Sequence, residues 1–365
     1  MSIQRVMMTA DTVGGVWTYA IELARGLAAR QVRVLLVTLG EPPHAGQRAQ
    51  AAAVPGLEMR HGAFPLEWMD GALESQPAAG QWLLKLATQW QPDVVHLNHY
   101  GHGHLPWPAP AVVVAHSCVC SWHEHVRGAP AGSEWNAYRA LVGRGLRAAP
   151  LVIAPTAAML ADVARLYGPL RDGRVIHNGR RPDEFEPAPK EDAVLCAGRL
   201  WDEAKNVRTL ATVAGDLPWP VRVAGEIWHP QGGRVHLRHI VPLGRLTPKA
   251  MAQAYAKAAI YTLPARYEPF GLTVLEAALS GCALVLGDIP SLRELWRGAA
   301  VFVPPNDPAR LHAALAQLMR EPLLRKAWAK RAAKRAQRYS AQRMVDHYLD
   351  VYATSTREEV HACVS

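Results

Sequence analysis

The sequence has few of the features that mark secreted or metal-binding chains. Its 365 residues include five cysteines, which are Cys118, Cys120, Cys196, Cys282 and Cys363. A scattered, odd-numbered set does not form a disulfide framework, and this indicates a reducing, cytoplasmic environment. Cys118 and Cys120 have no second cysteine pair downstream, so the sequence does not indicate a zinc site there.

Long apolar runs are also missing. A membrane-spanning helix needs roughly 18–20 apolar residues, and no run in the chain approaches that length. The apolar stretch at the N-terminus is soon followed by Asp11 and glycines, so we expect residues 3–10 to form a buried strand and not a signal peptide. Hydrophobic residues make up 50% and charged residues 19% of the chain, which is typical of folded domains and argues against disorder.

Acidic residues are too few to balance the basic ones, and the formal net charge is +9. Much of the excess lies in residues 325–338, RKAWAKRAAKRAQR. We interpret this segment as the solvated face of a helix, while peripheral docking to an anionic membrane surface is the alternative. The segment lacks the interleaved aromatic residues of nucleic-acid-binding domains, so no nucleic-acid partner is expected.

The order of apolar and amphipathic segments predicts two α/β domains. A chain of this length suffices for two domains at roughly 100–200 residues each, and runs of Val, Ile and Leu are typical of parallel strands covered on both faces. We expect strands at 5–10, 32–40, 92–98, 111–117, 151–156, 193–200, 221–226, 258–265 and 283–288, and helices at 16–30, 206–217 and 270–282. The segment 177–192 is rich in proline and charge and predicts the linker.

The most informative segment is 265–282, ARYEPFGLTVLEAALSGC. It has Glu268 and Glu276 on either side of a loop-to-helix junction. Pro269 suits the first helical position, and Gly271 suits the close approach of a ligand to the backbone. The first amides of such a helix are unpaired and can bind a phosphate or sugar oxygen.

The spacing of Glu268 and Glu276 also bears on the chemistry. An unbroken helix would place the two carboxylates about 80° apart in azimuth, which is too far for them to share a proton. They therefore do not indicate a paired-carboxylate hydrolase. They predict separate contacts to one elongated, hydroxyl-rich ligand, and two glutamates exposed to solvent are the alternative interpretation.

A loop rich in cations follows the strand expected at 193–200. Arg199 and Lys205 lie six residues apart in CAGRLWDEAKN. Two cations at a strand end can neutralise a pyrophosphate and stabilise it as a leaving group. The alternative is that the neighbouring Asp202 and Glu203 pair with these cations.

The sequence lacks two patterns that would indicate other classes of protein. The glycine pair after the first expected strand, in TADTVGGVWTY, does not match the dinucleotide fingerprint G-x-G-x-x-G. The chain contains no D-x-D, so a Mg²⁺ or Mn²⁺ clamp on a diphosphate is not indicated. The histidine-rich segment 96–104, HLNHYGHGH, has no neighbouring Cys or carboxylate, and a metal site is not favoured there either.

The motif E-P-F-G-L-x-x-L-E at 268–276 and the G-R-L…K pattern of the cationic loop resemble the retaining GT-B glycosyltransferases, in particular glycosyltransferase family 4 (glycosyl transferases group 1). The resemblance covers nearly the whole chain. It implies two doubly wound Rossmann-like domains that face each other across a cleft. The acceptor-side domain would be 1–180, the nucleotide-sugar donor domain 181–340, and 341–365 a C-terminal helix that returns to the first domain.

The resemblance assigns roles in the donor domain. Glu276 would bind the ribose hydroxyls of the nucleotide, and Glu268 would contact the donor sugar as a catalytic residue. Arg199 and Lys205 would hold the pyrophosphate in place of a metal ion. The remaining predicted donor-binding groups are the backbone amides of Phe270, Gly271 and Leu272.

The resemblance also assigns roles in the first domain. Gly15 would approach the donor phosphates, and His116, at the end of the strand expected at 111–117, would be a catalytic residue that orients the donor sugar. His96 would support the cleft floor, and the segment 96–104 would contact the acceptor. One departure follows the Asn-Gly of HNGRR, because the family often has an acidic residue there and this chain has Arg180 and Arg181.

The expected activity is therefore transfer of a hexose from a UDP- or GDP-linked sugar to a hydroxyl acceptor with retention of configuration. No cofactor beyond this co-substrate is expected. The acceptor would be a sugar, a lipid-linked sugar or a small molecule, in polysaccharide or glycolipid synthesis. The alternatives are an NAD(P)-dependent oxidoreductase and a non-catalytic nucleotide-binding protein.

Overall fold

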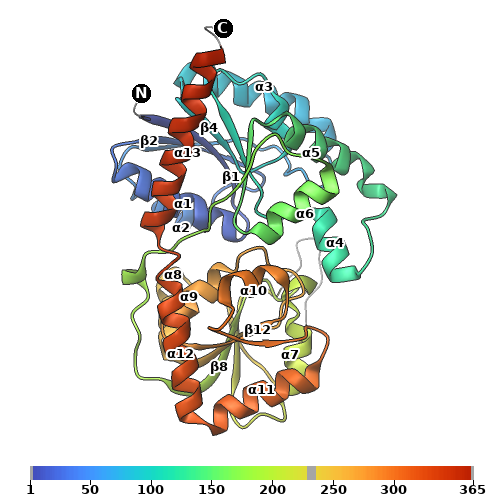
Figure 1. The fold of residues 1–365 in the computed structure, drawn as a ribbon, viewed down its shortest axis with the longest axis vertical. Coiled ribbons are helices and arrows are strands. Elements are labelled where there is room, and N and C mark those ends of the chain that lie inside the picture. The colour runs from blue at the N-terminus through green and yellow to red at the C-terminus, as the bar shows by residue number, and fades with distance from the viewer. Residues whose placement is uncertain (1–2, 228–235, 363–365) are drawn as a thin grey trace. The chain divides into compact units, whose positions relative to one another are not determined.

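The computed structural model describes residues 3–227 and 236–362. These residues form two compact units (Figure 1). The first unit extends to Glu124 and includes Ala129–Gly179 and the residues from Ala341 onward. The second unit comprises His125–Gly128 and Arg180–Ser340. The end of the chain thus belongs to the first unit although it follows the second in sequence.

The first unit contains a parallel sheet of seven strands in the order β3-β2-β1-β4-β5-β6-β7. Its strands are β1 (Arg5–Asp11), β2 (Arg33–Leu39), β3 (Leu57–His61), β4 (Val94–Leu97), β5 (Ala111–Val114), β6 (Leu151–Ala154) and β7 (Gly173–Val175). The chain leaves β1 towards β2 and later returns to its other side with β4. The ends of β1 and β4 therefore form a topological switch point, where ligands of such sheets bind.

The helices of the first unit include one from the far end of the chain. They are α1 (Gly15–Ala28), α2 (Ala45–Ala52), α3 (Ala72–Trp90), α4 (Val119–Arg127), α5 (Asn136–Ala148), α6 (Ala157–Tyr167) and α13 (Ala341–Ala362). Helix α13 packs against α1. A β-carbon on Gly26 would lie 2.2 Å from a methyl of Val345, so the two helices are in close contact. Met344, Tyr348 and Tyr352 of α13 are buried in the same core as β1.

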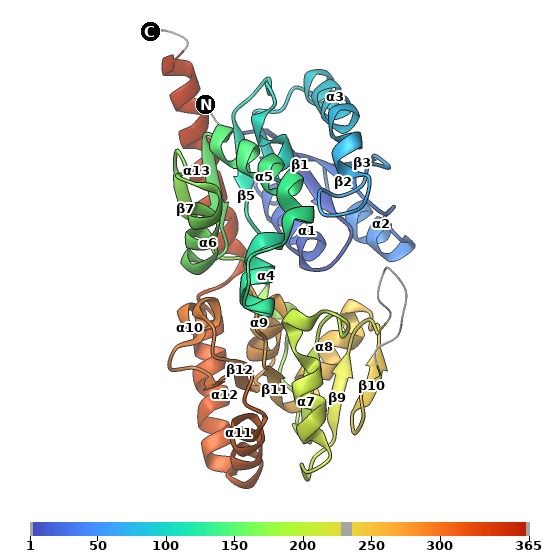
Figure 2. The ribbon, with the colours of Figure 1, turned by 90° about the vertical axis from the view of Figure 1, so that its right-hand side faces the viewer.

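The second unit contains a parallel sheet of six strands in the order β10-β9-β8-β11-β12-β13. Its elements are β8 (Glu191–Ala197), α7 (Val207–Ala214), β9 (Val221–Ala224), β10 (Val241–Gly244), α8 (Pro248–Lys257), β11 (Ala258–Leu263), α9 (Leu272–Leu279), β12 (Ala283–Gly287), α10 (Pro290–Trp296), β13 (Val301–Val303), α11 (Pro308–Arg320) and α12 (Pro322–Ala336). Helix α7 packs against α11, and α9 packs against α8 and α12. Figure 2 shows β9 and β10 side by side at one edge of the sheet.

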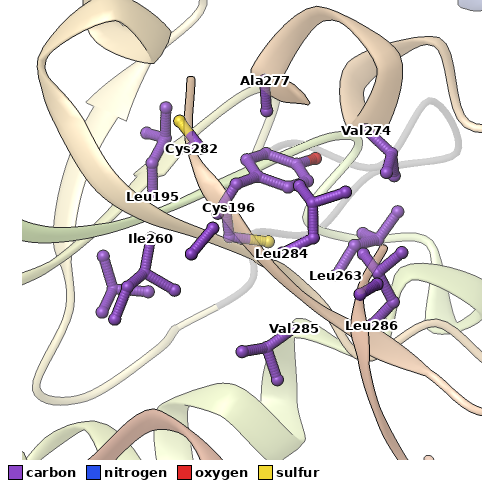
Figure 3. Packing of buried hydrophobic residues seen from close by; sticks show 14 of the residues in the cluster. Leu195, Cys196, Ile260, Leu263, Val274, Ala277, Cys282, Leu284, Val285 and Leu286 are labelled. Carbon is purple, nitrogen blue, oxygen red and sulfur yellow. The ribbon is translucent and has the colours of Figure 1, made fainter. Parts of the chain in front are cut away.

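The core of the second unit lies between the sheet and helices such as α9 (Figure 3). Cys196 on β8 and Cys282 before β12 are completely buried there. Burial raises the pKa of the Cys196 thiol to about 12 and that of Cys282 to about 11. Both thiols therefore stay protonated at neutral pH and act as apolar packing groups.

The expected fold class is confirmed, and every strand that the sequence predicted overlaps a strand of the structure. The sequence did not predict β3, β7, β10 or β13, nor helices α2 to α6, α8, α10 and α11. No helix among residues 3–227 and 236–362 is both long and apolar enough to cross a membrane. The basic segment 325–338 lies mostly in α12, where Lys326, Lys330 and Lys334 are exposed while Ala332 is buried.

Candidate functional site

The cationic loop begins where β8 ends, and Asp202 organises its first part. One carboxylate oxygen of Asp202 accepts a hydrogen bond from the Ala204 amide at 3.0 Å, and the other accepts one from the Arg199 guanidinium at 2.7 Å. The pairing of Arg199 by Asp202, one of the alternatives from sequence, is therefore present. Glu203 pairs with Arg127 at 3.0 Å and not with either loop cation, so that half of the alternative is wrong.

Lys205 forms a short ion pair with Glu268. Its Nζ lies 2.5 Å from Oε2 of Glu268, and the two side chains are 16% and 12% exposed. Two hydrogen bonds, one between backbone groups and one from a side chain, link their loops. The Arg266 amide donates to the Ala204 carbonyl at 2.8 Å, and the Asn206 side chain donates to the Pro264 carbonyl at 2.9 Å. The structure thus brings together a cation and an acid that lie far apart in sequence.

The backbone segments that follow β8 and β9 approach each other closely. Gly225 follows β9 with φ of +140°, and a β-carbon there would lie 1.7 Å from the Gly198 carbonyl oxygen. No side chain fits in that space. The Gly198 backbone, which leads into Arg199, is therefore fixed against the end of β9.

The helix expected at 270–282 is shorter than predicted. Helix α9 begins at Leu272 because Gly271 has φ of +84° and lies outside helical geometry. The prediction that Pro269 occupies the first helical position is therefore wrong, and the azimuth expected for an unbroken helix does not apply. The helix ends before Gly281, as predicted, where φ is +77°.

The three backbone amides predicted for ligand binding lie in the loop that leads into α9 and at the first residue of that helix. The Phe270 amide lies 3.4 Å from Oε1 of Glu268, to which it donates. The Gly271 carbonyl accepts from the Leu275 amide at 3.1 Å, and Leu272 is the first residue of the helix. The loop at the start of α9 thus helps to orient the Glu268 carboxylate.

Glu276 lies inside α9 and is 8% exposed. Its Oε1 is 3.0 Å from Nε of Arg180, and the two side chains are 11% and 10% exposed. The alternative that Glu268 and Glu276 are surface glutamates is therefore wrong. Each of the two carboxylates has its own cation, Lys205 for Glu268 and Arg180 for Glu276.

In the first unit, His116 follows β5 and bonds to Asn98, which follows β4. The Asn98 side-chain nitrogen donates to the Thr9 carbonyl at 2.6 Å, so the amide oxygen faces the histidines. That oxygen lies 2.7 Å from Nε2 of His116. Because an amide oxygen only accepts, His116 carries its hydrogen on Nε2, and Nδ1 is the acceptor of the neutral ring.

The same amide oxygen lies 3.2 Å from Nε2 of His96. The other ring nitrogen of His96, Nδ1, is 2.6 Å from the Tyr352 hydroxyl of α13. Burial lowers the pKa of His96 to about 3, and burial followed by the neighbouring His96 and His99 lowers that of His116 to about 3. Both rings are therefore neutral at pH 7.

The first unit also contains Gly15 and the histidine-rich segment 96–104, for which the sequence predicted ligand contacts. Gly15 is exposed at the first position of α1, after Gly14 with φ of +77°. His99 and His102 are buried, and burial lowers their pKa values to about 3 and about 4. Within the described part of the chain no group of three or more His, Cys, Asp or Glu side chains is arranged to hold a metal ion.

The structure therefore divides the predicted site residues between the units. Gly15 and His116 belong to the first, and Arg199, Lys205, Phe270, Gly271, Leu272, Glu268 and Glu276 to the second. A hollow of about 420 Å³ beside the cationic loop is lined by Leu200, Ile227, His236, Leu237, Arg238, Ile240 and Pro242.

Sequence reasoning missed three side chains that organise these sites. Asp202 was considered only as a competitor for the cations, yet it orients Arg199. Asn98 had a usable signal, because it follows His96 by two residues and a strand places such residues on one face. Arg180 was noted as a departure from the family pattern, but nothing local indicated Glu276 as its partner.

Two family models match the chain. Residues 13–184 match Glycosyltransferase Family 4, and residues 181–335 match Glycosyl transferases group 1. The chain is 28% identical over 349 residues to a glycogen synthase of Mycobacterium tuberculosis (strain CDC 1551 / Oshkosh), with 86% of this chain and 80% of the relative covered. It is 25% identical to a phosphatidyl-myo-inositol mannosyltransferase of Mycobacterium leprae, with 94% of both chains covered.

Solved structures share the fold. A sucrose-phosphate synthase from Thermosynechococcus elongatus superimposes with a TM-score of 0.79 at 17% identity, covering 96% of this chain and 98% of the other. Anabaena Alr3699/HepE in complex with UDP-glucose gives 0.77 at 17% identity, covering 96% and 99%. Two parallel α/β units, these neighbours and the family models together define a glycosyltransferase of the GT-B class. The chain belongs to glycosyltransferase family 4.

Proposed function

We propose that the protein transfers a hexose from a UDP- or GDP-linked sugar to a hydroxyl acceptor, with retention of configuration and without a divalent metal. The observation that carries this proposal is the contact between Lys205 and Glu268, because it places a cation and an acid at the junction of two tethered loops. Such a pair can bind both halves of a sugar phosphate, with the ammonium on the phosphate and the carboxylate on a hydroxyl.

The diphosphate would be bound by Lys205 and Arg199. An ammonium has three N–H donors and a guanidinium has five, so their contacts to Glu268 and Asp202 use only a part of this capacity. Arg199 is 40% exposed, which suits a group that meets an incoming ligand. As the bond to the sugar breaks, charge grows on the departing phosphate, and these fixed cations stabilise it.

The two carboxylates would bind hydroxyls at separate points. Glu268 is oriented by Lys205 and the Phe270 amide and would contact the donor sugar. Glu276 lies deeper in α9 and would bind the ribose hydroxyls of the nucleotide. Apolar residues such as Leu200 and Ile240 line the hollow that includes part of the cationic loop, and this lining would suit the flat face of a nucleobase.

The proposed route is attack by the acceptor hydroxyl on the same face from which the diphosphate departs. The new C–O bond forms as the bond to the diphosphate breaks, and the departing phosphate accepts the acceptor's proton. His116 would orient a donor-sugar hydroxyl through Nδ1, since Nε2 is bonded to Asn98. Gly15 would approach the donor phosphates at the start of α1.

The relatives support classes of donor and acceptor. The Anabaena structure contains UDP-glucose, and the curated relatives include a glycogen synthase and a lipid mannosyltransferase. We propose a polysaccharide or lipid-linked sugar as acceptor and action in the cytoplasm. The exposed lysines of α12 suit peripheral contact with an anionic membrane.

A thermal-shift screen against nucleoside diphosphates and their sugars tests this function. We expect at least one to raise the melting temperature, because a ligand that binds only the folded state stabilises it. Glu276→Ala should lose this response to the best ligand, and the exposed Glu186→Ala should keep it. If no nucleoside diphosphate stabilises the wild type while NAD(P) does, the transferase proposal fails in favour of an oxidoreductase.

A further inference from the structure

Arg180 is held from several sides in the second unit. Its guanidinium contacts Glu276 at 3.0 Å and Glu184 at 3.1 Å, and it lies 5.0 Å from the centre of the Phe185 ring. Its backbone amide donates to the Tyr339 carbonyl at 3.1 Å. The side chain is 10% exposed, so its position is fixed by its surroundings.

The next residue provides a contrast. Arg181 is 39% exposed, and it pairs with Glu184, whose side chain is 30% exposed. The two adjacent arginines thus share one acidic neighbour, but the buried one also reaches into the nucleotide site. This difference makes Arg181 a matched control for Arg180.

A buried carboxylate such as Glu276 needs a nearby cation. Without one, burial favours the protonated, neutral form. A neutral carboxyl accepts hydrogen bonds from two hydroxyls less well than an ionised carboxylate does. The guanidinium of Arg180 supplies the required charge 3.0 Å from Oε1 of Glu276, and its own position is fixed by Glu184 and Phe185.

We propose that Arg180 is a positioning residue of the nucleotide site, which keeps Glu276 ionised and oriented to bind the two ribose hydroxyls. This inference rests on the proposed function, because it assumes that a nucleotide binds at α9. The inference adds to the proposed function a preference for one class of nucleotide. The site should select ribonucleoside diphosphates over analogues that lack the ribose hydroxyls, and that selection should depend on Arg180.

Calorimetric titration tests the inference with UDP, GDP and their 2′,3′-dideoxy analogues. The wild type should bind one ribonucleotide more tightly than its dideoxy analogue. Arg180→Met should weaken binding of that ribonucleotide by roughly tenfold or more, as for loss of a charge-assisted hydrogen bond, and leave binding of the dideoxy analogue unchanged. Arg181→Met should behave as the wild type. A purely structural role would weaken binding of both nucleotides equally.

Arg180→Lys serves if the methionine variant does not fold. It retains the positive charge but loses the planar donors, and we expect it to lose several-fold of the preference for the ribonucleotide. An unchanged preference in the folded variants, or tighter ribonucleotide binding by Arg180→Met, would overturn the inference. The latter result would mean that Arg180 competes with the ribose for Glu276.

The Glu276→Gln variant separates this inference from the proposed function. If Glu276→Gln loses the ribose preference and the folded Arg180 variants keep it, the nucleotide site stands and the role of Arg180 is wrong. If the wild type binds none of the four nucleotides, the proposed function itself fails.

Discussion

The two units bury their polar groups in different ways. In the first unit, His96 and His116 are neutral members of a hydrogen-bonded network around Asn98. In the second, Lys205 pairs with Glu268, and Arg180 pairs with Glu276. Burial of an unpaired charge costs far more than burial of a hydrogen-bonded neutral group, and each unit meets this constraint with different chemistry.

The difference matches the two kinds of group in the proposed reaction. A neutral network offers donors and acceptors to sugar hydroxyls without adding charge. Ion pairs with fixed positions keep cations oriented. In the proposed reaction these cations would stabilise the negative charge that grows on the diphosphate as the sugar departs. We therefore expect substitutions in the second unit to affect nucleotide binding and turnover, and those in the first-unit network to affect stability and, at His116, turnover.

The largest effect is expected for Lys205→Ala. The variant removes a cation from the diphosphate and leaves the largely buried Glu268 without its partner. We expect turnover to fall by about 10²–10³-fold, the range for loss of one stabilising donor, in an assay with the best nucleotide sugar. Lys257→Ala, which removes an exposed lysine 3.5 Å from Glu191, is the control. A similar loss in both variants would show that the Lys205 pair has no special role.

The next effect concerns Glu67 of the first unit and its pH dependence. Burial raises the pKa of this carboxyl to about 7, although it accepts hydrogen bonds from the Tyr100 and Gly101 amides. The unfolded chain loses this proton near pH 4.5 and the folded chain near pH 7, so Glu67 lowers the free energy of unfolding as pH rises between these values. The loss should be roughly 2–3 kcal/mol from pH 5 to pH 8.

Denaturant unfolding at pH 5 and pH 8 measures this contribution of Glu67 to the free energy of unfolding. Glu67→Gln should destabilise the protein more at pH 5 than at pH 8, because only the wild type has the pH-dependent contribution. Glu74→Gln, on an exposed part of α3, should show no such difference. A cost of Glu67→Gln that is the same at both pH values would contradict the assigned pKa shift.

The smallest effect is expected for Tyr352→Phe. The variant removes the 2.6 Å hydrogen bond to His96 and should lower the free energy of unfolding by about 1 kcal/mol. Nucleotide affinity should stay unchanged, because Tyr352 contacts His96 and none of the residues proposed to bind the nucleotide. Calorimetry that shows weaker nucleotide binding by Tyr352→Phe would break the proposed separation between the two units.

The sequence predicted the fold well where the signal is local. Runs of Val, Ile and Leu identified the central strands, since these residues pack on both faces of a parallel sheet. Short or partly exposed strands such as β3 and β7 lack that pattern and were missed. The start of α9 was misplaced because a glycine can continue a helix or interrupt it, and the chosen backbone conformation of Gly271 depends on its surroundings.

The ligand-binding roles of the site residues stay predictions, and the pairings between these residues were not predicted. The motifs indicated Lys205, Glu268 and Glu276 as ligand-binding groups. The contacts of Lys205 with Glu268, of Arg180 with Glu276 and of His96 with Tyr352 join distant parts of the chain. Only the folded backbone brings such partners together, so local spacing does not reveal them.

The central claim is that the charged groups of the second unit bind a sugar nucleotide. Its most direct test is a crystal structure of the protein with the nucleoside diphosphate that stabilises it most. We expect phosphate oxygens within hydrogen-bond distance of Lys205 and Arg199, and ribose hydroxyls within hydrogen-bond distance of Glu276. A nucleotide bound elsewhere, with Lys205 and Glu276 still paired only to protein groups, would contradict it.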